Sequence, residues 1–518
     1  MLIPVIVGLG LTACRALVRW GARGSDGENI PDVMYRVTVK GGVIRFLPVV
    51  AKTAAAAIVL GTGGSVGAEG PVVVLGAAAA SRIGRWLRAS PNRLRTLVGC
   101  GAAAGISAAF NAPITGVIFG IEKILGAAGG MALGPFVVAS ILAATVGRAV
   151  FGDNPVIALP AAFAIHTPWE LLLYVVLGLV TGVVSVAYSR SVWKAQDLFA
   201  RLRSPALQVV LGALLVGALD LAFRADLWGH GHESLNIGIV ATRGALFLLA
   251  LAGAKLLATA FTFGAGGTGG VFTPALFIGA TLGGALGVGV TTLAPGWGGH
   301  IEPGAVALVG MAGLVAGATH APLTAIMMVF EMTRDYGLIL PLMLTSVIAY
   351  AVARRLNPES IYSEWLARRG VVLSHGTDAA VLARTTVADC VDRDIVTIPA
   401  HADLRTMHTL IQDSRQAEFP VVSEDGRLVG MLHREALRDA VEAGDHAAPL
   451  VVAADLVRAH AERVTPEDSL LTALRRLGAE DVDHLPVVDV TTKEALLGIV
   501  SRQDLMAAYE RALSSEHG

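Results

Sequence analysis

The sequence predicts an all-helical, polytopic membrane domain built from two repeats, followed by an α/β domain outside the membrane. Three observations support this fold class. Of the 518 residues, 54% are hydrophobic and only 16% are charged, whereas ordinary soluble chains have about 25% charged residues. Residues 1–370 contain 26 basic and 16 acidic residues, and residues 371–518 contain 14 and 25. Motifs of the first part also recur later in the same order.

The composition excludes several classes of protein and site. The acidic tail disfavours nucleic-acid binding, which needs positive charge. Cys14, Cys100 and Cys390 lie far apart without a CxxC pair, and the histidines lack metal-ligand spacing, so neither a disulfide framework nor a metal site is expected. The chain is apolar from Met1 to its first charge at Arg15, which indicates a start inside a membrane helix rather than a secretory signal.

The first part contains two kinds of apolar segment. Those at residues 169–188 and 338–353 are long enough to form transmembrane helices. Others are short or interrupted by glycine and proline, namely residues 46–60, 98–110, 113–125 and 304–318. Helices that stop partway across a bilayer are tolerated where they line a protein cavity. We therefore expect the short segments to surround a path for a solute.

The repeat consists of two blocks in each half. Residues 111–115, Asn-Ala-Pro-Ile-Thr, match residues 320–324, His-Ala-Pro-Leu-Thr, and a lone acid follows each proline by nine residues, at Glu122 and Glu331. Upstream, the glycine-rich residues 63–71 match residues 266–274. Paired halves with interrupted helices are typical of transporters whose site lies between the repeats.

A glycine-rich turn before a helix offers free backbone N–H groups and the positive end of the helix dipole. Two such helix starts facing each other would hold a partly dehydrated anion, although glycines also serve close helix packing. Glu69 lies in the first block, and Phe272 occupies the equivalent position of the second block, so the scaffold does not require an acid there. Its carboxylate would compete with the anion for the same donors, which predicts a gate controlled by pH and voltage. The alternative is a capping glutamate at an aqueous surface.

Glu122 and Glu331 share one repeat position, which favours a structural role in bonding exposed backbone ends, with proton handling as the alternative. Lys123 follows Glu122 directly. It either extends to the membrane interface or belongs to a proton path.

These motifs resemble those of the CLC family of chloride channels and proton–chloride exchangers, over about residues 1–370. Residues 67–71, Gly-Ala-Glu-Gly-Pro, resemble the family's GxEGP, and residues 270–274, Gly-Val-Phe-Thr-Pro, resemble its GxFxP anion loop. The resemblance implies inverted repeats and a homodimer with an anion path in each subunit. It also implies that Glu69 is the external gate. The anion would be held by the amides of Val271 and Phe272 and the hydroxyl of Tyr362.

Three features depart from the family pattern. Glu28 occupies the position of the family's central serine, where a carboxylate would repel an anion. Either Glu28 points away, or Asn29 or a backbone amide replaces the serine, or the ion preference differs. Lys123 replaces the internal proton glutamate of exchangers, which predicts weak or absent proton coupling. The region before Gly27 is short, which suggests an incomplete amino terminus.

The tail, after a linker at residues 371–384, contains two copies of a βαβ-like pattern at residues 385–444 and 445–513. They resemble a tandem pair of cystathionine-β-synthase (CBS) domains, which often bind adenine nucleotides. The second copy has the typical hydroxyl and acid, Ser501 and Asp504, whereas the first has His433 and Ala436. The alternative is a pair that serves only dimerisation.

We therefore expect a membrane protein that transports chloride or a similar anion, is gated by Glu69, and is channel-like with weak or no proton coupling. Stoichiometric proton–chloride exchange is the alternative, and a membrane-anchored nucleotide sensor is the alternative of another class. An enzyme is not expected, since HExxH and paired catalytic carboxylates are missing. No cofactor is expected beyond a nucleotide on the CBS pair. The Arg368-Arg369 pair favours a cytoplasmic location for the tail. We expect the protein to lie in the cell membrane.

Overall fold

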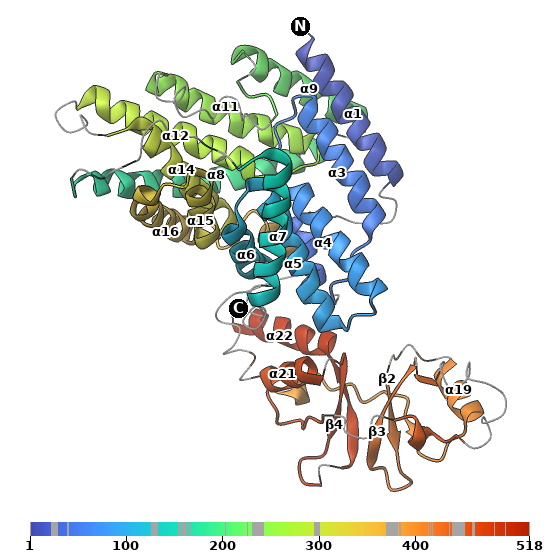
Figure 1. Ribbon diagram of the computed structural model, residues 1–518. Coiled ribbons are helices and arrows are strands. Elements are labelled where there is room, and N and C mark those ends of the chain that lie inside the picture. The colour runs from blue at the N-terminus through green and yellow to red at the C-terminus, as the bar shows by residue number, and fades with distance from the viewer. Residues whose placement is uncertain are drawn as a thin grey trace. The chain divides into compact units, whose positions relative to one another are not determined.

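The computed structural model (Figure 1) divides the chain into two compact units, which are described separately. The first comprises Met1–Ala89 and Arg93–Leu373, and the second Ser90–Asn92 and Ser374–Gly518. The structure describes residues 2–21, 29–38, 41–125, 133–153, 157, 163, 165, 167–202, 204–224, 226–229, 243–294, 301–368, 382, 385–412, 414, 416, 418–434, 436–437, 451–457, 462–480, 482–492 and 494–516.

The first unit consists of helices, which Figure 1 shows packed into one bundle. They are α1 (Ile3–Gly21), α2 (Ile30–Thr38), α3 (Phe46–Gly61), α4 (Glu69–Trp86), α5 (Pro91–Phe110), α6 (Pro113–Phe119), α7 (Leu133–Phe151), α8 (Glu170–Ala200), α9 (Pro205–Ala222), α11 (Ala245–Gly264), α12 (Phe272–Leu293), α14 (Pro303–Thr319), α15 (Pro322–Thr333), α16 (Ile339–Leu356) and α17 (Ser363–Ala367). A π-helical turn, η1 (Gly120–Leu125), continues α6.

Within the described residues, seven helical segments are long and apolar enough to cross a membrane: α1, α7, α8, α9, α11, α12 and the segment Tyr336–Leu356 that contains α16. The two spans predicted at residues 169–188 and 338–353 lie in α8 and α16. The apolar helices α3 and α14 are shorter, as predicted, and α15 is a further short apolar helix. Helix α5 begins at Pro91, earlier than the predicted residue 98.

The two repeats also match in their backbone details. Helices α4 and α5 approach closely at Gly76 and Gly101, where an added Cβ on Gly76 would lie 2.2 Å from the Gly101 oxygen. Helices α12 and α14 approach in the same way at Gly279 and Gly310, at 2.3 Å. Such contacts leave no room for side chains and fix how the helices cross. The core of the unit therefore has the same construction in both halves.

The second unit contains two small sheets. Strands β1 (Ile398–Pro399), β2 (Glu418–Val422) and β3 (Leu428–His433) form one, and β4 (His484–Val488) and β5 (Leu496–Ser501) form the other. β2 pairs antiparallel with β3, and β4 pairs in the same way with β5. The helices include α19 (Leu404–Gln412), α21 (Leu470–Glu480) and α22 (Arg502–Glu516).

Candidate anion site between the repeats

The two glycine-rich loops bond to each other. The amide of Gly67 donates to the Gly270 carbonyl at 2.8 Å, and the amide of Gly270 donates to the Gly67 carbonyl at 2.7 Å. These glycines are equivalent residues of the two repeats, and their bridge is antiparallel. A reciprocal antiparallel pair of equivalent residues implies a local two-fold axis between the repeats. The bridge brings the starts of α4 and α12 together at this axis.

The Glu69 carboxylate lies on the start of α12. Its Oε1 accepts from the Phe272 amide at 2.8 Å and from the Thr273 amide at 3.3 Å, and its Oε2 accepts from the Thr273 hydroxyl at 2.7 Å. The side chain is only 2% exposed. A helix start binds anions because its amides are free and its dipole end is positive. Glu69 therefore occupies donors that the sequence assigned to the transported anion.

Glycines make the space that Glu69 fills. An added Cβ on Gly67 would lie 1.9 Å from Oε2 of Glu69, and one on Gly270 would lie 2.0 Å from Oε1. No side chain fits at either position while the carboxylate is in place. The glycines of the two motifs are thus explained by the buried glutamate as well as by the bridge between the loops.

Two buried tyrosines differ in their bonding. The Tyr362 hydroxyl has no hydrogen-bond partner in the described structure, although the residue is only 4% exposed. The Tyr188 hydroxyl donates to the Val271 carbonyl at 2.8 Å. A pocket reaches this region. Its lining includes Tyr362, Val271 and Asn29, together with residues of α8. Of the predicted anion ligands, Phe272 donates to Glu69 and Val271 uses its carbonyl, while Glu28 lies outside the described residues.

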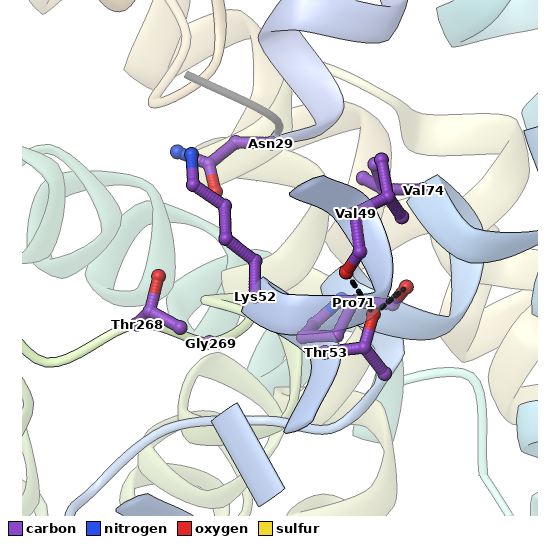
Figure 2. Close-up of a pocket in the computed structure, with 8 residues that line it drawn as sticks. All are labelled: Asn29, Val49, Lys52, Thr53, Pro71, Val74, Thr268 and Gly269. Carbon is purple, nitrogen blue, oxygen red and sulfur yellow. Dashed lines mark hydrogen bonds between the residues drawn. The ribbon is translucent and has the colours of Figure 1, made fainter. Parts of the chain in front are cut away.

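A second, smaller pocket opens beside the first glycine-rich block (Figure 2). Figure 2 shows the Lys52 side chain extending toward Asn29, on the same side as Thr268. The Thr53 hydroxyl donates to the carbonyls of Val49 at 2.9 Å and Pro71 at 3.5 Å. Lys52 was not singled out from the sequence. Its repeat position could have revealed it, because Lys255 lies the same 203 residues downstream that separate the glycine blocks.

Glu122 and Glu331 each accept hydrogen bonds from the other repeat. Glu331 accepts from the amides of Ile114 and Thr115 at 2.9 and 2.7 Å and from the Thr115 hydroxyl at 2.6 Å. Glu122 accepts from the amide and hydroxyl of Thr324 at 2.9 and 2.5 Å. Each glutamate thus caps the proline-started helix of the other repeat, α6 or α15, where free amides need acceptors. This geometry supports the structural reading of both residues.

Lys123 lies in the π-helical turn and is 9% exposed. Its side chain is therefore largely enclosed by the helices of this unit. Its neighbour Glu122 is the charge with which it interacts.

In the second unit, Ser501 and Asp504 bond to each other at the start of α22. Oδ2 of Asp504 accepts from the Ser501 amide at 2.9 Å and from its hydroxyl at 2.6 Å. The hydroxyl and carboxylate are the groups a nucleotide's phosphate and ribose would need, but here they cap the helix. The corresponding residue His433 lies across the sheet from Glu418. Glu418 also approaches His484, at 3.9 Å.

Burial lowers the pKa of His484 below its ordinary value, against the charges of Asp483 and Asp504, which favour protonation. The described residues contain no group of three or more His, Cys, Asp or Glu side chains suited to a metal ion.

Comparisons with known proteins agree with this arrangement. The family model of voltage-gated chloride channels matches residues 9–354, and the CBS domain model matches residues 387–443 and 453–511. A ClcB-like chloride channel protein of Ralstonia nicotianae is 38% identical over 71% of this chain and 85% of its own length. The H(+)/Cl(-) exchange transporter ClcA of Cronobacter sakazakii is 33% identical over 68% of this chain and 76% of its own.

Among solved structures, a slow cyanobacterial Cl-/H+ antiporter superposes with a TM-score of 0.64 at 28% identity, covering 71% of this chain and 87% of its own. The family match covers most of the chain. The chain is an integral membrane protein that belongs to the CLC family of chloride transport proteins and carries two CBS domains.

Proposed function

We propose that this protein conducts chloride or a similar small anion along a path that Glu69 closes and opens. One observation carries the proposal: the Glu69 carboxylate bonds to the Phe272 and Thr273 donors at the start of α12. An anion in the path needs the same donors, so the carboxylate and the anion exclude each other. Protonation or displacement of Glu69 frees the donors, which makes flux depend on pH and voltage.

The site suits an anion that must also leave. Its donors are backbone amides, the Thr273 hydroxyl and the unpartnered Tyr362 hydroxyl, rather than a full positive charge. Neutral donors bind a chloride-sized anion strongly enough to replace part of its water shell but weakly enough to release it. The helix dipole of α12 adds a favourable partial charge.

We propose weak or absent coupling to protons. Lys123 stands next to Glu122 where a second acid would be needed, and Glu122 itself is engaged by Thr324 in capping α15. Stoichiometric exchange remains the second candidate. It is supported by the exchanger names of the ClcA relative and the cyanobacterial antiporter. In that case the proton must travel by a route other than Lys123.

We also propose a homodimer in the cell membrane, with residues 1–370 as the transport domain, a linker at 371–384, and a cytoplasmic CBS pair at 385–444 and 445–513. An adenine nucleotide would bind at the second copy, where Ser501 and Asp504 would have to exchange their mutual bonds for phosphate and ribose. The first copy offers no carboxylate at Ala436.

The test is anion efflux from liposomes containing the wild-type protein, Glu69→Ala, and the control Glu364→Gln, measured across external pH. Glu364 lies in α17 and accepts a hydrogen bond from Arg368 at 3.1 Å, and none of the bonds described at the start of α12 involves it. We expect flux that rises at low pH in the wild type and the control, and faster, pH-independent flux in Glu69→Ala. An unchanged pH response in Glu69→Ala would contradict the gate. Absence of anion flux in all three would favour the nucleotide-sensing alternative.

A further inference from the structure

We propose that Tyr188 is a positioning residue of the anion site, which acts through the peptide bond between Val271 and Phe272. The Tyr188 hydroxyl donates to the carbonyl of this peptide at 2.8 Å. The N–H of the same peptide donates to Oε1 of Glu69, also at 2.8 Å. The inference rests on the proposed function and names a residue in α8 that sets the strength of the donor at the start of α12.

The peptide is a weakly constrained part of the fold without Tyr188. Its carbonyl begins the hydrogen-bond ladder of α12, but the Ala275 amide lies 3.3 Å away, longer than the Tyr188 contact. Val271 precedes the first helical residue, Phe272, so the preceding turn does not hold its peptide. The tyrosine therefore provides the shorter of the two bonds that fix the direction in which the Phe272 N–H points.

The bond also strengthens the donor. A hydrogen bond accepted by a peptide carbonyl polarises the N–H at the other end of that peptide, and chains of such bonds reinforce one another in a low-dielectric interior. Here the chain runs from the Tyr188 hydroxyl through the peptide to Glu69. Tyr188 and Phe272 are both 0% exposed, so water does not compete for these bonds. Tyr188 therefore strengthens the binding of whichever anion lies at the start of α12, the carboxylate or a transported ion, without contacting that anion.

The two tyrosines of the site thus have different tasks. The Tyr362 hydroxyl is unpartnered in the described structure and is available to a ligand, whereas the Tyr188 hydroxyl is committed to the frame. Tyr188 lies on α8. Replacing it with phenylalanine removes the hydroxyl and its hydrogen bond to Val271, while the ring still fills the same volume. Tyr188→Phe therefore isolates the bond from the packing.

The matched control is Tyr174→Phe, which removes another buried tyrosine hydroxyl from the same helix, 14 residues earlier. Each variant is made alone and in the Glu69→Ala background, purified as the full chain and reconstituted. Chloride efflux is recorded against chloride concentration and against pH. In the Glu69→Ala background we expect Tyr188→Phe to raise the chloride concentration for half-maximal flux about 3- to 10-fold, the effect of one ordinary hydrogen bond.

With Glu69 present, Tyr188→Phe weakens the hold on the carboxylate, so the pH of half-maximal flux moves upward, while Tyr174→Phe leaves both values as in the parent. A purely structural role of Tyr188 would lower yield or thermal stability without moving either value, and that result would overturn the proposal. If Tyr188→Phe does not fold, a fluorinated tyrosine at this position, a stronger donor, must move the pH midpoint downward, and an unmoved midpoint overturns the proposal.

The same experiment separates this inference from the proposed function. If wild type and Glu69→Ala respond identically to pH, the gate assignment fails. If they differ but Tyr188→Phe behaves like Tyr174→Phe, the gate stands and the positioning role is wrong.

Discussion

A single methyl group at Gly67 should displace the Glu69 carboxylate from the start of α12 without altering Glu69 itself. A Cβ built on Gly67 would lie 1.9 and 2.3 Å from the two carboxylate oxygens of Glu69 and 2.4 Å from the carbon that joins them. These three atoms are its nearest contacts, and all belong to the end of a flexible side chain. In Gly67→Ala the backbone can therefore stay in place while the carboxylate must leave the start of α12.

The size of the effect follows from the bonds that Glu69 gives up. Two are short, from the Phe272 amide at 2.8 Å and the Thr273 hydroxyl at 2.7 Å. Bonds to a charged acceptor contribute about 1.5–3 kcal/mol each, and water replaces part of that once the side chain is free. A net loss of about 3 kcal/mol lowers the occupancy of the closed position about 150-fold. Flux should therefore lose most of its pH dependence, as in Glu69→Ala, but should stay below the Glu69→Ala level, because the methyl occupies part of the space that a transported anion would enter.

The assay is chloride efflux from liposomes between acidic and neutral pH, with two controls. Gly61→Ala adds a methyl at the end of α3, where a Cβ meets nothing within 4 Å, and should leave flux unchanged. Gly67→Ala in the Glu69→Ala background should leave the pH response unchanged, since the carboxylate it displaces is gone; this is a double-mutant cycle. A wild-type pH response in Gly67→Ala, or an equal effect in both backgrounds, would refute the reasoning.

Three further predictions concern stability and reactivity. Glu331→Ala should lower the thermal unfolding temperature in detergent more than Glu122→Ala does. It removes three hydrogen bonds rather than two, each contributing about 1–3 kcal/mol. A smaller decrease in Glu331→Ala than in Glu122→Ala would contradict the capping roles. Because burial lowers the pKa of His484, the unfolded chain binds that proton first as pH falls below about 6.5. Amide-exchange protection of β4 should therefore decline with acid in the wild type more than in His484→Gln, and equal declines would argue against it. Burial raises the pKa of Cys390 to about 11, so its alkylation in the folded full chain should keep accelerating well above pH 9; a plateau near pH 9 would contradict this.

Much of the site could be predicted because its chemistry is local. The glycine-rich blocks, the proline-started helices and the lone acid at Glu69 can each be recognised within a few residues. The glycine-rich blocks and the proline-started helices also occur twice, once in each repeat. Comparing Glu69 with Phe272 also indicated that the acid is not needed by the scaffold. The structure then placed the carboxylate on the α12 donors, which the proposed function assigns to the transported anion.

The remainder depends on contacts between residues far apart in the chain. The sequence shows that Glu122 and Glu331 occupy equivalent positions. It does not show that each caps a helix of the other repeat, because this depends on the two-fold axis that brings α6 and α15 together. Tyr188 reads as one more residue of a long apolar run, because nothing near it in sequence reveals that its hydroxyl meets Val271. Lys123 reads as an interfacial cation, since the burial of its π-helical turn is a tertiary property.

The most direct test of the central claim is chloride efflux from liposomes containing the purified full-length protein, with external pH recorded at the same time. The account predicts chloride efflux that depends on pH through Glu69 and drives little or no proton movement. Protons driven against their gradient in a fixed ratio to chloride would contradict it, and would show that Lys123 does not prevent coupling.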